Sequence, residues 1–186
     1  MPVKRIVTGV TSLDEARYFS AMGVDWIGFD AHRVDPAIAS AIMGWVVGPQ
    51  FFAEWNDVDA DTQFAFIDTT GIDTICLPAH IETPAWFDGK RIFRVSQGTR
   101  DQSLPSNQIV LITGDGAMAS DALGRICMTH VCWLEADADY DMSNLREPLP
   151  RGIAIRCETS INSMDTAYDR YDRFFDALES LDQHDT

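Results

Sequence analysis

Short apolar segments recur along this chain at nearly regular intervals, and this recurrence limits its possible folds more than any other feature. Eight of them are four or five residues long and rich in β-branched or aromatic side chains, as strands are. They are Arg5–Thr8, Trp26–Asp30, Gln50–Glu54, Thr74–Leu77, Ile92–Ser96, Ile109–Thr113, Val131–Glu135 and Ile153–Cys157. Several are almost continuously hydrophobic, which is typical of strands buried on both faces of a parallel sheet.

Helical patterns separate most of these segments. Ser12 is placed to cap a helix over Leu13–Met22, with Glu15 completing a capping box. Pro36 precedes a second helix over Ala37–Trp45, at the position that proline favours. The other predicted helices are Asp59–Asp68, Ser120–Thr129, Ser143–Leu149 and a long amphipathic helix from Met164 to Leu181, whereas the proline-containing connections Ile81–Gly89 and Gln97–Gln108 predict loops.

Strands that alternate with helices predict an α/β fold with a parallel sheet. Eight units in 186 residues leave about 23 residues for each, which is short for a (βα)8 barrel and requires short loops. We therefore expect residues 1–186 to form one compact (βα)8 barrel domain, of the kind called a TIM barrel. An open doubly wound sheet of about five to seven strands is the alternative.

The charge balance and the cysteines exclude several classes of partner. Fourteen Lys and Arg residues face 29 Asp and Glu residues, so the formal net charge is −15, which repels nucleic acids and anionic membranes. No segment approaches the roughly 20 apolar residues that a membrane span needs. Four scattered cysteines without metal-site spacing are typical of reduced thiols in the cytoplasm. We predict a cytoplasmic protein without a metal, another cofactor, or a nucleic-acid or membrane partner.

The first two units contain a recognisable pattern of residues. Arg5-Ile6-Val7-Thr8-Gly9-Val10-Thr11, followed by a helix with Glu15-Ala16, resembles the Lys-Ile-Cys-Gly-Ile-Thr strand and Glu/Asp-Ala helix of phosphoribosylanthranilate isomerases. The second unit, Gly23–Phe29, is similar to that family's Gly-Ala-Asp-x-x-Gly-Phe. The resemblance covers about the first 48 residues. It implies a (βα)8 barrel, with an active site at the carboxyl ends of the strands, that rearranges a phosphorylated sugar in tryptophan biosynthesis.

Relative to that family, the positions that carry the chemistry are substituted. The resemblance places Thr8 at the position of the catalytic cysteine base and Thr113 at that of the catalytic aspartate, with Asp115 two residues further on. A threonine hydroxyl is a far weaker base than a thiolate near neutral pH. The glycine turns that hold phosphate are also missing, because no glycine occurs between Arg125 and Arg151. We therefore expect a divergent relative without isomerase activity.

Polar residues at the strand ends form the candidate ligand site at the mouth of the barrel, where the carboxyl ends of the strands meet. The resemblance implies that Arg33 meets the ligand's carboxylate. The other candidates for ligand binding are charged residues at the predicted strand ends, namely Asp30, Glu54, Arg94, Glu135 and Arg156. We expect a small molecule or a protein partner to bind there; the sequence leaves the oligomeric state open.

Four other interpretations of the mouth compete with this one. A working isomerase would need displaced groups, with Asp115 as the acid and Asp30, Glu54 or Cys157 as the base. A different enzyme with a cationic or neutral substrate would also suit a mouth rich in carboxylates. A metal site built on His32 and His80, or a nucleophilic Cys76 or Cys157, would suit the residue types, but neither has a supporting spacing.

Overall fold

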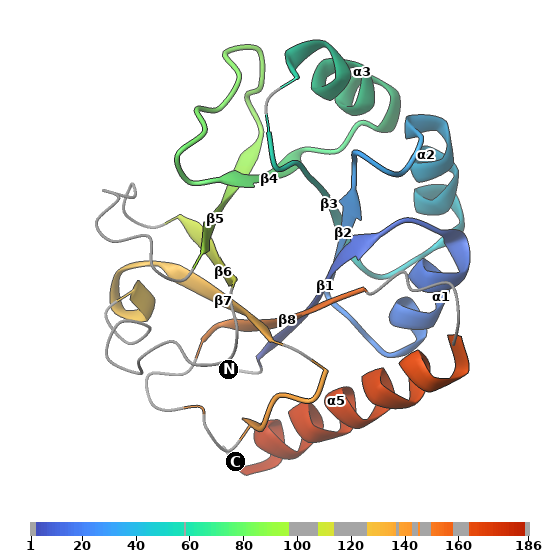
Figure 1. The fold of residues 1–186 in the computed structure, drawn as a ribbon, viewed down its shortest axis with the longest axis vertical. Coiled ribbons are helices and arrows are strands. Elements are labelled where there is room, and N and C mark those ends of the chain that lie inside the picture. The colour runs from blue at the N-terminus through green and yellow to red at the C-terminus, as the bar shows by residue number, and fades with distance from the viewer. Residues whose placement is uncertain are drawn as a thin grey trace.

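Eight parallel strands close into a barrel in the computed structural model (Figure 1). The structure describes residues 3–57, 59–96, 108–113, 126–136, 138–142, 145, 150–157 and 164–184. The strands are β1 (Lys4–Val10), β2 (Trp26–Asp30), β3 (Gln50–Glu54), β4 (Thr74–Pro78), β5 (Lys90–Ser96), β6 (Ile109–Thr113), β7 (Val131–Ala136) and β8 (Gly152–Arg156). Each strand pairs with the next along the chain, and β8 pairs with β1. The predicted (βα)8 barrel is confirmed, and the alternative of an open sheet is wrong.

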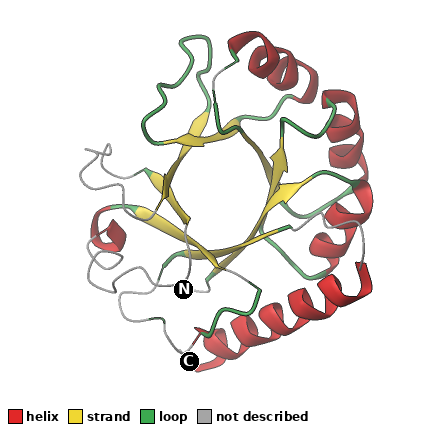
Figure 2. Ribbon diagram, in the orientation of Figure 1, coloured by secondary structure: helices red, strands yellow, loops and turns green. Residues whose placement is uncertain are grey.

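Helices lie around the outside of the barrel (Figure 2). They are α1 (Leu13–Ala21), α2 (Pro36–Trp45), α3 (Ala60–Thr70) and α5 (Met164–His184); residues 126–129 are helical as well. The predicted capping box of Ser12 and Glu15 is present, and Pro36 begins α2. Most of the predicted helices Ser120–Thr129 and Ser143–Leu149, and of the predicted loop Gln97–Gln108, lies outside the described residues.

Some predicted strand ends are shifted, and pairing between strands explains the shifts. We expected the last strand over Ile153–Cys157, but β8 starts and ends one residue earlier because it pairs with β1 from Lys4 to Thr8. β5 begins two residues before the predicted Ile92, because Lys90 pairs with Thr74 of β4. Local hydrophobicity does not contain this information, since the register of a strand is set by its neighbour.

The C-terminal helix α5 packs beside α1 on the outside of the barrel (Figure 1). The hydroxyl of Tyr18 on α1 donates a 2.5 Å hydrogen bond to Asp172, and the carbonyl oxygen of Tyr168 lies 3.1 Å from the same hydroxyl. The rings of Phe19 on α1 and Phe175 on α5 also pack together, with ring centroids 6.3 Å apart. The contact joins the two ends of the chain. Among the described residues, no helix combines the length and the apolar character that crossing a membrane requires.

The connection between β4 and β5 contains no helix, in agreement with the loop predicted over Ile81–Gly89. Arg91 organises this loop from the outer face of β5. Its guanidinium donates hydrogen bonds to the carbonyl oxygens of Pro78 and Ile81 and to the hydroxyl of Thr83. These bonds satisfy carbonyl groups that a helix would otherwise pair internally.

Side chains fill the barrel interior in layers, as the alternation of strands requires. One buried apolar layer takes one residue from each of β1, β3, β5 and β7, namely Ile6, Phe52, Ile92 and Trp133. The even-numbered strands add Cys76, Leu111 and Ala154. Two residues further along the odd-numbered strands, side chains on the same face lie at the mouth. There the interior changes from apolar to charged.

Candidate functional site

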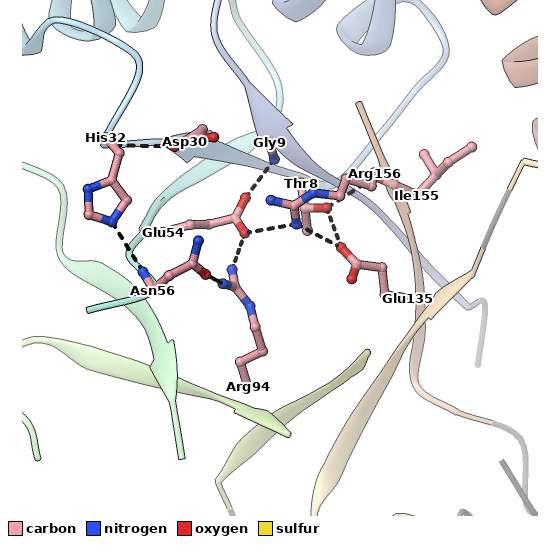
Figure 3. Close-up of polar contacts among 10 residues, drawn as sticks. All are labelled: Thr8, Gly9, Asp30, His32, Glu54, Asn56, Arg94, Glu135, Ile155 and Arg156. Carbon is pink, nitrogen blue, oxygen red and sulfur yellow. Dashed lines mark hydrogen bonds and ion pairs between the residues drawn. The ribbon is translucent and has the colours of Figure 1, made fainter. Parts of the chain in front are cut away.

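Four polar residues, one from each odd-numbered strand, close the top of the barrel interior. They are Thr8 of β1, Glu54 of β3, Arg94 of β5 and Glu135 of β7, and Figure 3 shows their side chains converging at the mouth. Arg156 of β8 reaches over the same group. Five of the residues predicted for the site are therefore brought together. The pleat of the strands accounts for this, because each lies two positions beyond a buried interior residue.

Glu54 lies at the centre of this group, with only 3% of its surface exposed. Its carboxylate accepts a 2.6 Å hydrogen bond from the backbone N–H of Gly9 and forms an ion pair with Arg94. The guanidinium of Arg156 lies 3.9 Å away on the solvent side. Burial raises the pKa of Glu54, while Arg94, Arg156 and the Gly9 N–H oppose this increase. A carboxylate so surrounded is suited to anchoring neighbouring groups.

Two glycines make room for the buried carboxylate. Gly9 has φ of +75°, in the left-handed region, and the pairing of β1 with β2 is irregular between Val7 and Val10. This irregularity accompanies the inward N–H that Glu54 accepts. At Gly28 of β2, a Cβ atom would lie 2.4 Å from the ring of Phe52 and 2.7 Å from a carboxylate oxygen of Glu54. The absence of a side chain at Gly28 is thus what allows Glu54 to point inward.

Arg94 links the buried carboxylate to the rim of the barrel. Its side chain is 10% exposed, and its second terminal nitrogen donates a 2.7 Å hydrogen bond to the amide oxygen of Asn56. Burial lowers the pKa of Arg94, but the neighbouring Cys76, Glu54 and Glu135 outweigh burial and leave it raised. Arg94 is therefore a permanent cation, and Glu54 offsets its charge.

Thr8 and Glu135 form the other half of the group. The Thr8 hydroxyl is fully buried and donates a 2.6 Å hydrogen bond to Glu135. Arg156, whose side chain is 44% exposed, lies 3.4 Å from the same carboxylate oxygen. The hydroxyl proton of Thr8 is thus held by an acceptor, and Glu135 is paired on both sides. Two carboxylates and two guanidiniums leave the group electrically balanced.

The other predicted site residues lie at the edge of the mouth. Asp30 accepts a 3.2 Å hydrogen bond from the backbone N–H of His32, and the exposed Arg33 follows in the same turn. Thr113 is half-buried at the end of β6. Asp115 lies outside the described residues. Asp30 therefore caps a turn, and Glu54 takes its partners from β1, β5 and β8.

A pocket of about 190 Å³ opens at the rim between the ends of β4, β5 and β6. Its lining combines apolar and polar groups: Pro78, Ala79, His80, Arg94, Val95, Ser96 and Thr113. Arg94 belongs both to this pocket and to the buried charged group. The pocket is thus connected to Glu54 through a single side chain.

The surroundings of Cys76, Cys157 and His32 do not favour the interpretations of the mouth as a nucleophile or metal site. Burial raises the pKa of the Cys76 thiol to about 12, and burial together with Glu15 raises that of Cys157. His32 lies 3.2 Å from Asp57 and accepts a hydrogen bond from the backbone N–H of Asn56. Within the described ranges, no three His, Cys, Asp or Glu side chains gather as metal ligands would.

Gly9 and Asn56 belong to the group at the mouth, although neither was predicted from the sequence. Gly9 follows Thr8 directly, and its role as a donor arises from the backbone conformation that only the pairing of β1 determines. Asn56 lies two residues after Glu54, so the alternation of an extended chain places it on the same side as Glu54. That spacing was the available signal for Asn56.

Comparisons with known proteins identify the fold. Neither protein-family models nor curated protein sequences match this chain. Phosphoribosylanthranilate isomerase from Thermus thermophilus superposes with a TM-score of 0.74 and 17% identity, over 96% of this chain and 100% of that one. Monomers generated from the dimeric enzyme of the same name from Thermotoga maritima superpose with a TM-score of 0.69 and 14% identity, over 96% of this chain and 99% of that one.

The fold of this chain is also similar to that of an enzyme with a different name. A truncated 3-deoxy-D-arabino-heptulosonate 7-phosphate synthase from Thermotoga maritima superposes with a TM-score of 0.58 and 10% identity, over 97% of this chain and 86% of that one. Because one barrel can carry different reactions, the site has to decide the function. Over nearly its whole length, the chain has the (βα)8 fold of the phosphoribosylanthranilate isomerases.

Proposed function

We propose that this chain is a divergent phosphoribosylanthranilate isomerase-like barrel that no longer catalyses the isomerase reaction and binds a small molecule at its mouth. The observation that carries the proposal is the hydrogen bond from Thr8 to Glu135. Thr8 occupies the position that the resemblance assigns to the catalytic base, and its hydroxyl is buried and already donates its proton at 2.6 Å. A group in this state positions Glu135 and removes no proton from a substrate.

The electrostatics of the mouth support the same proposal. The isomerase substrate carries a phosphate, which needs free backbone N–H groups or uncompensated cations. Here Arg94 is paired with Glu54, and Arg156 lies near both Glu54 and Glu135. The segment between Arg125 and Arg151 supplies no glycine for a phosphate turn. A neutral polar or zwitterionic molecule fits this balanced mouth better than a phosphate dianion does.

The pocket beside Arg94 is where we place the ligand. Its volume of about 190 Å³ is below the roughly 300 Å³ of pockets that hold drug-sized molecules, so it suits only a ligand of a few heavy atoms, and His80, Ser96 and Thr113 lie among its apolar walls. The ligand would touch the outer side of Arg94, while the buried side stays bound to Glu54 and Asn56. Glu54 and Asn56 would then act as positioning residues for Arg94.

A thermal-shift screen with neutral sugars, phosphosugars, amines and divalent metals tests the binding proposal. We expect a neutral or zwitterionic compound to raise the melting temperature of the wild type, and His80→Gln or Ser96→Ala to reduce that shift. Glu82→Gln, in the same loop but outside the pocket lining, is the matched control and should keep it. A shift that all variants retain would place the ligand elsewhere. A response to phosphosugars alone would contradict the proposed ligand class, and binding of a protein but no small molecule would contradict the proposal itself.

The alternative is a working isomerase with displaced groups, and the structural similarity to isomerases along the chain favours it. Asp115 would be the acid, and Asp30, Glu54 or Cys157 the base. The surroundings oppose each described candidate, because Asp30 caps a turn, Glu54 is paired with Arg94, and the raised pKa of Cys157 keeps its thiol protonated. Growth of a tryptophan auxotroph lacking its own isomerase, when it expresses this chain, would establish the alternative.

A further inference from the structure

Helix α2 and the turn after it carry no charged residue. The segment Pro36–Pro49 contains no Asp, Glu, Lys, Arg or His, in a chain whose formal net charge is −15. Its outer side is open to solvent, with exposed fractions of 52% for Ile38, 71% for Trp45 and 89% for Val47. Figure 1 shows α2 on the outside of the barrel, between α1 and α3. Exposed apolar side chains that gather in this way are typical of an interaction surface.

Trp45 is held in place although it is exposed. The guanidinium of Arg17 on α1 lies 6.0 Å from the centre of the Trp45 ring, within the range of a cation–π contact. The hydroxyl of Ser20 donates a 3.3 Å hydrogen bond to the carbonyl oxygen of Val47 and fixes the turn beyond the helix. The surface is therefore ordered before anything binds, which lowers the entropic cost of association.

We infer that this surface, defined by Ile38, Ala41, Trp45 and Val47, binds a second copy of the same chain. Ile38, Ala41 and Trp45 follow one another at helical spacing of three and four residues, so they share one side of α2. A two-fold axis beside Ala41 sets Ile38 of each copy against the partner's Trp45. The small Ala41 lets the two helices approach closely, and each apolar group then covers its counterpart.

Charge favours a second copy over other occupants. Two chains with a net charge of −15 repel each other over most of their surfaces, and contact costs least where both are uncharged. A basic protein would seek the carboxylates that this surface lacks, and an anionic membrane would be repelled by the chain as a whole. Because α2 has ten residues, the contact is short, and we expect micromolar affinity.

Sedimentation equilibrium over micromolar to submillimolar concentrations tests the inference. We expect the mass to rise from the monomer's 20.7 kDa toward twice that value, and association to tighten as salt screens the repulsion between copies. Trp45→Glu and Val47→Glu should each weaken self-association at least about tenfold. Both side chains are exposed, so far-UV circular dichroism should be unchanged.

The matched control is Met128→Glu, because Met128 is 72% exposed and lies on another element. This variant should associate like the wild type. A wild type that stays monomeric at every concentration and salt level would overturn the inference. So would a dimer that survives both Trp45→Glu and Val47→Glu, or one that Met128→Glu disrupts.

Cross-linking tests the position of the two-fold axis. Ala41→Cys places one thiol on each side of the axis, so mild oxidation should give a disulfide-linked dimer that reducing agent dissolves. Met128→Cys, with a similarly exposed thiol away from α2, should form no such dimer under the same conditions, and neither should the wild type with its native cysteines. Failure of Ala41→Cys to cross-link would reject the proposed packing.

Discussion

Gly28 lies on the inner side of β2, where the ring of Phe52 and the carboxylate of Glu54 occupy the space that a side chain would need. Gly28→Ala should therefore lower the free energy of unfolding by about 2 kcal/mol or more, because the added methyl group overpacks a closed interior. Urea denaturation followed by tryptophan fluorescence measures this change. Gly44→Ala is the control, since nothing lies within 4 Å of its added Cβ; this variant should keep or slightly raise the stability. Equal losses in both variants would contradict the packing described for the mouth.

Cys76, in the apolar layer below Glu54, makes the free energy of unfolding depend on pH in the alkaline range. Burial raises its pKa in the folded protein to about 12, above the value of about 8.5 for an unfolded thiol. Between these values the unfolded chain binds fewer protons, so stability is fully present below about pH 8.5 and falls as the pH rises toward 12. Cys76→Ala should show a shallower decline in urea midpoints between about pH 8 and pH 10.5. Identical slopes for variant and wild type would reject this assignment.

At the level of single residues, the sequence predicted the members of the site better than their partners. The predicted strand ends located Glu54, Arg94, Glu135 and Arg156, and the resemblance located Thr8. Which carboxylate pairs with which guanidinium depends on how the closed barrel sets strands distant in sequence side by side. For the same reason, the residue type of Gly9 did not indicate that its backbone N–H donates a hydrogen bond to Glu54.

The capping box at the start of α1 is the clearest local signal in the chain, and it ties the helix to β1. Glu15 accepts hydrogen bonds from the backbone N–H groups of Thr11 and Ser12, and Ser12 accepts one from Glu15. Ser12→Ala should lower stability by about 1 kcal/mol, because the backbone N–H of Glu15 loses its acceptor. Thermal unfolding measures the loss, and Ser12→Asp should restore most of it. A variant as stable as the wild type would show that the cap contributes nothing.

Elements defined by their own residues were predicted well, and elements defined by their neighbours less so. The bounds of β2, β3 and β6 match the prediction, because each is a short apolar run that ends at a polar residue. The bounds of β1, β5 and β8 depend on pairing and shifted by one or two residues. In the β4–β5 connection, proline predicted the absence of a helix, but the role of Arg91 in ordering that loop required the structure.

The charge of the whole molecule affects its stability as well as its partners. With 29 acidic and 14 basic residues, self-repulsion opposes the compact state, and salt reduces this repulsion. The urea midpoint at pH 7 should therefore rise between low salt and about 1 M salt, where the screening length is about 3 Å. The measurement belongs at submicromolar protein, where the chain is monomeric, and the increase should shrink at about pH 4, where carboxylates become protonated. A midpoint that falls or stays constant with salt at pH 7 would contradict this account.

The whole barrel was predictable from the sequence because its eight units repeat a pattern, whereas the loss of a reaction is a property of a few side chains. The proposed loss depends on Thr8 being buried and bonded to Glu135, and on guanidiniums already paired with carboxylates. The most direct test gives purified protein freshly prepared phosphoribosylanthranilate and follows the decrease in the fluorescence of that substrate. We expect a rate no higher than that without protein. Robust, enzyme-dependent turnover that grows with protein concentration would contradict it.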